Sequence, residues 1–273
     1  MLLSKCRKPV DTFAPSLGRL YRSLRDATVR DASLPTKYGF TLAGDPTMAR
    51  EDWEADEIEA FLDLMRSHDV VVDIGANVGM YTCLAASRGR HVIAFEPARR
   101  NLNFLYRNLW ENQLSSVEVF PLGLGAQCGL ARMYGYGGIA SFVPGWAQAR
   151  RAHSSIVPLT TLDTVLAGRL EGSKALIKMD VEGFELEVLA GAGKMLSLEP
   201  KPTWLVEILL NGEVIPGGTS PKFGRTFDLF WRYGYICRTL DASRKLVSRE
   251  DVLRWLHDGR VDGDTHDFLF MAS

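Results

Sequence analysis

The chain has 273 residues, of which 46% are hydrophobic and 24% charged, and its formal net charge is −1. This balance supports one large α/β domain with additions and is unlike that of a disordered chain. The near-neutral charge lacks the strong positive field of most nucleic-acid binders, so we expect no nucleic-acid partner.

Residues 1–50 are predicted to form an N-terminal extension of the domain that residues 51–273 form. Four apolar residues between Leu17 and Leu24 recur at helical spacing, with arginines between them. This pattern favours a short helix that packs on the domain, and a helix on an anionic membrane or partner is the alternative. A better helix is predicted to begin at Asp52, where acidic residues crowd its positive N-terminal end.

Strands and helices alternate after this point. The continuous β-branched run Val70-Val71-Val72 is typical of a buried parallel strand. Seven strands are predicted in all, at residues 70–73, 91–95, 117–121, 175–179, 204–208, 235–239 and 267–271. Helices are predicted at residues 80–87, 101–110 and 184–196. The alternation indicates an α/β fold with a doubly wound, mostly parallel seven-stranded sheet. A small β insert is predicted over about residues 130–158.

The segment from Val72 to Tyr81 leads from a strand through a glycine turn into a helix. Glycine lets a ligand approach the backbone, and open α/β sheets bind ligands at the carboxyl ends of their strands. A dinucleotide fingerprint would place further glycines where Asn77 and Met80 stand, which disfavours a nicotinamide-dependent oxidoreductase. Asp73 would repel a pyrophosphate but attract the cationic amino-acid end of S-adenosylmethionine.

A second carboxylate supports a nucleoside ligand at the same edge of the sheet. Glu96 ends the second predicted strand, 23 residues after Asp73. A carboxylate there can accept hydrogen bonds from both hydroxyls of a ribose. The alternative is that Asp73 caps the following helix and that Glu96 is solvated.

Several motifs, in this order, resemble the FkbM family of methyltransferases. Besides the glycine turn they are Phe95-Glu96-Pro97, Thr161-Leu162-Asp163, the run Ile177 to Glu185, Leu189-Ala190-Gly191-Ala192 and Val206-Glu207. The block Lys178-Met179-Asp180-Val181-Glu182-Gly183 is the most specific of them, because the glycine turn alone would fit many methyltransferases. The likeness covers about residues 36–210.

This resemblance implies a class I, Rossmann-like methyltransferase fold with S-adenosylmethionine as the methyl donor. It also implies O-methylation of a hydroxyl on a sugar, glycolipid or secondary metabolite, so the partner is a small-molecule or glycan acceptor. An RNA or protein acceptor is the alternative and would need a basic channel.

By match of position, the resemblance also assigns a cofactor-binding set. The methionine end of the cofactor would contact Asp73, Gly75, Asn77 and Gly79, and Glu96 would hold the ribose. Tyr81 and Pro97 complete the set. After the third predicted strand, Leu124-Gly125-Ala126 offers no acidic side chain for the adenine amino group, so the adenine contacts stay open.

Methyl transfer to a hydroxyl needs a group that removes the hydroxyl proton. We predict that Asp180 is the catalytic base and that Lys178 or Glu182 orients it, since alternation along the strand places Lys178 and Asp180 on one side. The alternative is a structural ion-pair network. With Glu207, the two carboxylates can also hold a divalent ion, but no ligand spacing demands a metal and we expect none.

Other residues near the predicted cleft have two interpretations each. His153 and His266 are either bases or surface residues, and the surface role is favoured. Four aromatic residues of the insert form either a wall for the acceptor or the core of a hairpin, namely Tyr134, Tyr136, Phe142 and Trp146. Met48 and Trp53 either fold over the cofactor or anchor a helix.

The cysteines and the apolar stretches indicate a soluble protein of a reducing compartment, and we expect a cytoplasmic location. No two of the four cysteines are close enough in sequence for a zinc knuckle or a C-x-x-C redox pair. No stretch reaches the roughly 18 apolar residues of a membrane span. Residues 1–10 lack the apolar run of a signal peptide. The oligomeric state is not indicated.

Overall fold

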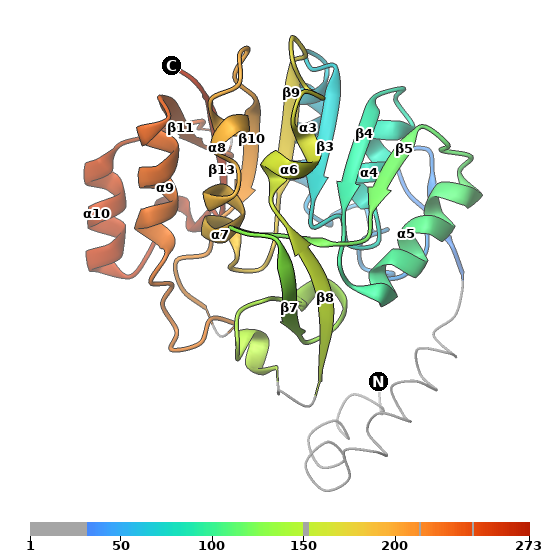
Figure 1. Ribbon diagram of the computed structural model, residues 1–273, viewed down its shortest axis with the longest axis horizontal. Helices are drawn as coiled ribbons and strands as arrows, with labels where there is room; N and C mark the ends of the chain where they lie inside the picture. The colour runs from blue at the N-terminus through green and yellow to red at the C-terminus, as the bar shows by residue number, and fades with distance from the viewer. Residues whose placement is uncertain (1–31, 150–152, 213, 242) are drawn as a thin grey trace, which may run out of the picture.

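The computed structural model describes residues 32–149, 153–212, 214–241 and 243–273. The helix predicted around residues 17–24 lies outside these ranges. A central sheet is covered by helices on both faces, and a small second sheet lies beside its lower edge in Figure 1. None of the helices in the described part combines the length and the apolar character that a membrane span requires.

Within the described residues the central sheet has eight strands, in the order β12-β11-β13-β10-β9-β3-β4-β5. Their bounds in this order are Leu246–Val247, Tyr235–Thr239, Asp267–Ala272, Thr203–Glu207, Ala175–Met179, Val70–Ile74, His91–Phe95 and Val117–Phe120. The five strands from β10 to β5 are parallel, and β13 is antiparallel to both β10 and β11.

All seven predicted strands form, but the sheet differs from the predicted seven-stranded, mostly parallel arrangement in two respects. The sheet is mixed, with four parallel and three antiparallel pairings in the described part, because β13 inserts between β10 and β11. The eighth strand, β12, pairs with β11 through only two residues, Leu246 and Val247. Two residues are too few to produce a periodic pattern in the sequence.

Alternation along the strands divides the core between the two faces of the sheet. Val70, Val72 and Ile74 of β3 face one hydrophobic cluster, whereas Val71 faces the other. Helices α3 (Ala55–Met65), α4 (Met80–Ala86) and α5 (Arg99–Glu111) belong to the second cluster. The first cluster is packed by α6 (Leu162–Leu166), α7 (Glu185–Ala190), α8 (Gly193–Leu196), α9 (Phe223–Arg232) and α10 (Arg249–Asp258).

The helix predicted over residues 184–196 is two helices, α7 and α8. The break lies at Gly191, where a Cβ atom would stand only 2.1 Å from the carbonyl oxygen of Gly125. The backbone amides of Lys194 and Met195 at the start of α8 donate to the carboxylate of Asp163. Asp163, part of one of the family-like motifs, therefore has a structural role in capping α8.

The insert forms a three-stranded sheet in the order β6-β8-β7, with bounds Gly123–Leu124, Ser154–Thr160 and Gly129–Tyr134. Strands β7 and β8 are an antiparallel pair, visible below the central sheet in Figure 1. The loop between them contains the 3₁₀ turns η1 (Gly137–Ile139) and η2 (Trp146–Gln148). A further turn, η3 (Asp262–Asp264), precedes β13.

The described residues before α3 pack against the domain. Strands β1 (Leu34–Pro35) and β2 (Thr41–Leu42) form a short antiparallel pair, and Leu42 is part of the core. The backbone N–H of Ala43 donates to Asn108 Oδ1 at 2.7 Å. Asn108 Nδ2 in turn donates to the carbonyl of Ala43 at 3.0 Å and to that of Val78 at 2.8 Å. This buried amide thus ties the N-terminal segment to the glycine turn, while a domain boundary at residue 50 stays a prediction.

Candidate active site

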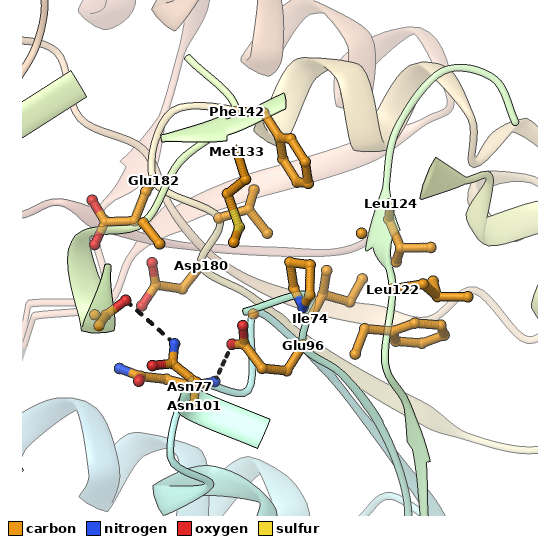
Figure 2. Close-up of a pocket in the computed structure, with 18 residues that line it drawn as sticks. Ile74, Asn77, Glu96, Asn101, Leu122, Leu124, Met133, Phe142, Asp180 and Glu182 are labelled. Carbon is orange, nitrogen blue, oxygen red and sulfur yellow. Dashed lines mark hydrogen bonds between the residues drawn. The ribbon is translucent and has the colours of Figure 1, made fainter. Parts of the chain in front are cut away.

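A pocket with an empty volume of about 580 Å³ lies at the carboxyl ends of β3, β4 and β9. Ligands of open α/β sheets bind at this edge. The insert supplies the side opposite Asn77 and Glu96, as the positions of Met133 and Phe142 in Figure 2 show. The full lining is Ile74, Gly75, Asn77, Phe95, Glu96, Pro97, Asn101, Leu122, Gly123, Leu124, Met133, Gly137, Gly138, Ala140, Phe142, Asp180, Val181 and Glu182.

The glycine turn begins at Gly75, which has a φ of +86°. A Cβ atom at this position would lie 1.8 Å from the carbonyl oxygen of Asp180. Glycine is therefore required here because the chain that leaves β9 passes close to Gly75. The sequence suggested that glycine in this turn makes room for a ligand, but at Gly75 it makes room for the neighbouring chain. The turn ends at Gly79, where α4 begins.

Glu96 is 5% exposed and reaches the pocket from the end of β4. Its Oε2 accepts a hydrogen bond from the backbone N–H of Asn77 at 2.8 Å, and its Oε1 accepts one from Ala98 at 2.6 Å. Burial raises the pKa of Glu96 to about 7, although these backbone hydrogen bonds favour the charged form. The alternative of a solvated Glu96 is wrong. Each carboxylate oxygen can accept a further hydrogen bond.

Three residues of the predicted cofactor set lie behind the pocket and do not line it: Asp73, Gly79 and Tyr81. Asp73 is 2% exposed and accepts a hydrogen bond from the Thr82 hydroxyl at 2.5 Å. Burial raises the pKa of Asp73, and the charge of Lys178 opposes this shift. Gly75, Asn77, Glu96 and Pro97 line the pocket, so the structure divides the predicted set into two groups.

Lys178 is 5% exposed and lies between carboxylates. Its Nζ is 3.4 Å from Asp180 Oδ2, 3.8 Å from Glu57 Oε1 and 4.3 Å from the centre of the Tyr81 ring. Burial alone would lower the pKa of Lys178, but the charges of Asp180 and Glu57 hold it well above its usual value. The Lys178 ammonium therefore stays charged beside Asp180, whose side chain is 34% exposed and lines the pocket.

The insert holds Glu182 in place. The Trp146 indole N–H donates to Glu182 Oε2 at 2.7 Å, and the Ser141 hydroxyl donates to the Glu182 carbonyl at 2.6 Å. Glu182 has a φ of 54°, a strained backbone for a residue with a side chain. Burial and the nearby charge of Asp180 raise the pKa of Glu182 to about 8.

The same contacts decide the roles of the insert aromatics. Trp146 is 3% exposed and packs against Gly183, where a Cβ atom would lie 2.4 Å from the indole ring. It anchors Glu182 and does not form a wall. Of the four aromatic residues of the insert, Phe142 alone lines the pocket, where its ring packs on Phe184.

Four carboxylates near Lys178 and Asp180 were not assigned to the catalytic set from the sequence. Glu54 and Glu57 come from the start of α3, and the Tyr81 hydroxyl donates to Glu54 at 2.9 Å. Glu207 and Asp267 are partners across β10 and β13, and burial raises the pKa of both well above the usual value. The acidic start of α3 was visible in the sequence but was interpreted as helix-end charge.

The remaining candidates do not line the pocket. They include His153 and His266. Met48 lines a neighbouring opening that shares Asn77, Asn101, Gly137 and Gly138 with the pocket, and Trp53 packs against Tyr81. In the described ranges, no three His, Cys, Asp or Glu side chains are arranged to hold a metal ion.

The sequence is similar to one protein family and to one curated protein. The sequence matches the family model described as "Methyltransferase FkbM domain" over residues 73–237. A curated protein from Haloferax volcanii, "Hexuronic acid methyltransferase AglP", is 27% identical over 195 residues, which are 66% of this chain and 77% of that protein.

Likenesses to solved structures are distant. Fibrillarin from Aeropyrum pernix, solved with S-adenosyl-L-methionine, aligns with a TM-score of 0.44 and 12% identity over 80% of this chain and 76% of that one. The bifunctional kinase-methyltransferase WbdD aligns with a TM-score of 0.46 and 15% identity, over 90% of this chain and 46% of that one.

Proposed function

The chain belongs to the FkbM family of methyltransferases, and from this premise we propose that it is an S-adenosylmethionine-dependent O-methyltransferase acting on a sugar hydroxyl. The observation that carries the proposal is the pocket at the carboxyl ends of β3, β4 and β9, which Glu96 and Asp180 both line. Family membership removes the oxidoreductase alternative. The hexuronic acid methyltransferase relative supports a sugar as the acceptor.

The residues that line the pocket fit a nucleoside with a charged end. Glu96 would accept hydrogen bonds from the ribose hydroxyls. Leu122, Leu124 and Phe142 offer apolar surface for a flat base, and the carboxylate of Asp180 would attract the cationic end. When bound, S-adenosylmethionine supplies a methyl group carried on a sulfonium.

Asp180 is the proposed acceptor of the hydroxyl proton. It is accessible from the pocket, and the adjacent Lys178 ammonium, 3.4 Å away, fixes the position of its carboxylate. Asp180 would take the proton of the acceptor hydroxyl as that oxygen receives the methyl group and the sulfonium sulfur keeps the electron pair of the broken S–C bond. Glu182, anchored by Trp146, closes the same side of the pocket.

Cofactor binding is tested by Glu96→Ala. We expect S-adenosylmethionine binding to weaken by about 1–3 kcal/mol, because the ribose hydroxyls lose their acceptor. Since the pKa of Glu96 is raised to about 7, the parent should lose affinity as the pH falls through that value and Glu96 becomes protonated. Calorimetry across this pH range measures both effects. The matched control is Glu118→Ala, which removes an exposed carboxylate paired with Arg169.

Charge around Asp180 bears on the acceptor. Asp180 and Glu57 are two carboxylates that share the single ammonium of Lys178, so the charge around the proposed base is negative on balance and an anionic acceptor would be repelled. We therefore expect an uncharged sugar to be methylated faster than the matching hexuronic acid, by about tenfold or more, since 1.4 kcal/mol of repulsion corresponds to a factor of ten. The same repulsion disfavours an RNA acceptor.

To compare the two rates, methyl transfer to glucosides and to glucuronides is measured by mass spectrometry. An alkali-stable methyl ether on the neutral sugar is the expected product. An alkali-labile methyl ester on the hexuronic acid, formed faster than any ether, would show that the acceptor atom is a carboxylate oxygen and that the proposal of a hydroxyl is wrong. Absence of binding and of transfer with S-adenosylmethionine would overturn the proposed cofactor.

A further inference from the structure

Glu57 lies on α3, before the region 73–237 that matches the family, yet its carboxylate reaches Lys178. Lys178 Nζ is 3.8 Å from Glu57 Oε1 and 3.4 Å from Asp180 Oδ2, so two carboxylates share one buried ammonium. The Glu57 side chain is 13% exposed. Within the described ranges, these two are the carboxylates within salt-bridge distance of Lys178.

This sharing has a chemical consequence for a base at Asp180. An ammonium beside a carboxylate favours its charged form and opposes its uptake of a proton. Lys178 by itself would thus hold Asp180 in place but make it a weaker base. A second carboxylate on the same ammonium offsets that charge. The triad of Glu57, Lys178 and Asp180 carries a net charge of −1, which becomes zero when Asp180 takes a proton.

We propose that Glu57 is a positioning residue that shares the Lys178 ammonium with Asp180 and so keeps Asp180 able to accept the hydroxyl proton. The proposal rests on the proposed function, because it requires Asp180 to act as the base. Glu57 touches neither the pocket nor the acceptor and acts through Lys178.

Other titratable groups interact with Asp180 from the elements packed around it, and their effect must remain constant in the test. They are Glu54 before α3, Asp73 on β3, Glu182 after β9, Glu185 on α7, Glu207 on β10 and Asp267 on β13. A change confined to Glu57 leaves all of these in place.

The test is Glu57→Gln, which keeps the size of the side chain and removes its charge. Without this negative charge, Asp180 loses its proton more readily, so we expect the acidic limb of the kcat profile to move to lower pH by about one unit. The value of kcat on the plateau above this limb should fall by about threefold, because a weaker base removes the hydroxyl proton less effectively. Affinity for S-adenosylmethionine should stay within twofold. The control, Glu59→Gln, removes an exposed carboxylate on the same helix and should match the parent.

A second variant separates charge from packing. Lys178→Gln should move the acidic limb to higher pH, and the double variant Glu57→Gln with Lys178→Gln should lie between the two single variants. A parent-like acidic limb in folded Glu57→Gln, or a double variant that matches Lys178→Gln, would overturn the inference while leaving the methyltransferase proposal intact. If Glu57→Gln does not fold, Glu57→Asp, which keeps the charge, must retain the parent's acidic limb, and a shift would overturn the inference. A parent without methyl transfer would overturn the proposed function and this inference together.

Discussion

Replacing Asp180 with asparagine is expected to lower kcat by about 10²–10⁴-fold, the usual contribution of a general base. The substitution keeps the size of the side chain and removes the charge that accepts the hydroxyl proton. Because a base acts only in the transition state, affinity for S-adenosylmethionine should change by no more than a few-fold. Steady-state kinetics with a sugar acceptor, together with calorimetry of cofactor binding, measure the two quantities separately.

The matched control is Asp63→Asn, which neutralises an exposed aspartate on α3 and should leave both quantities unchanged. Turnover by Asp180→Asn within a few-fold of the parent would make Asp180 a structural partner of Lys178. Loss of cofactor binding together with turnover would mean that the carboxylate organises the pocket, and the base would then have to be another group.

Replacing Gly75 with alanine is expected to lower the free energy of unfolding by about 4 kcal/mol or more, a loss found only when a named structural feature is destroyed. The added Cβ atom would lie 1.8 Å from the Asp180 carbonyl oxygen, so the ends of β3 and β9 must separate. The pocket lies at this junction, and we therefore expect S-adenosylmethionine binding to be lost as well.

Gly89→Ala is the matched control for this change. Gly89 has a φ of +74° and nothing within 4 Å of an added Cβ atom, so alanine there adds only backbone strain. That strain costs about 1–2 kcal/mol. Urea denaturation of the two variants separates strain from steric contact. An equal loss in both variants would show that the contact with Asp180 does not constrain the junction.

Local patterns were sufficient for seven of the eight strands of the central sheet in the described residues and for the position of the pocket. The β-branched run Val70-Val71-Val72 is typical of a buried strand, and this prediction is confirmed by β3, which spans Val70–Ile74 and is buried throughout. Glu96 follows the next strand, and parallel strands place their carboxyl ends at one edge of a sheet, so its position at the pocket followed from the order of elements. The motifs that resemble FkbM methyltransferases led to the family that the chain belongs to. The catalytic roles of Asp180, Lys178 and Glu182 stay predictions.

The tertiary structure decided what depends on contacts between distant segments. The antiparallel insertion of β13, the break at Gly191 and the anchoring of Glu182 by Trp146 each join residues far apart in the chain. Glu57 is the clearest case, because its spacing on α3 indicates only a charged helix end, while the fold brings it to Lys178. Periodicity reports which side of an element is buried, but not which element covers it, because that choice depends on the packing of the whole sheet.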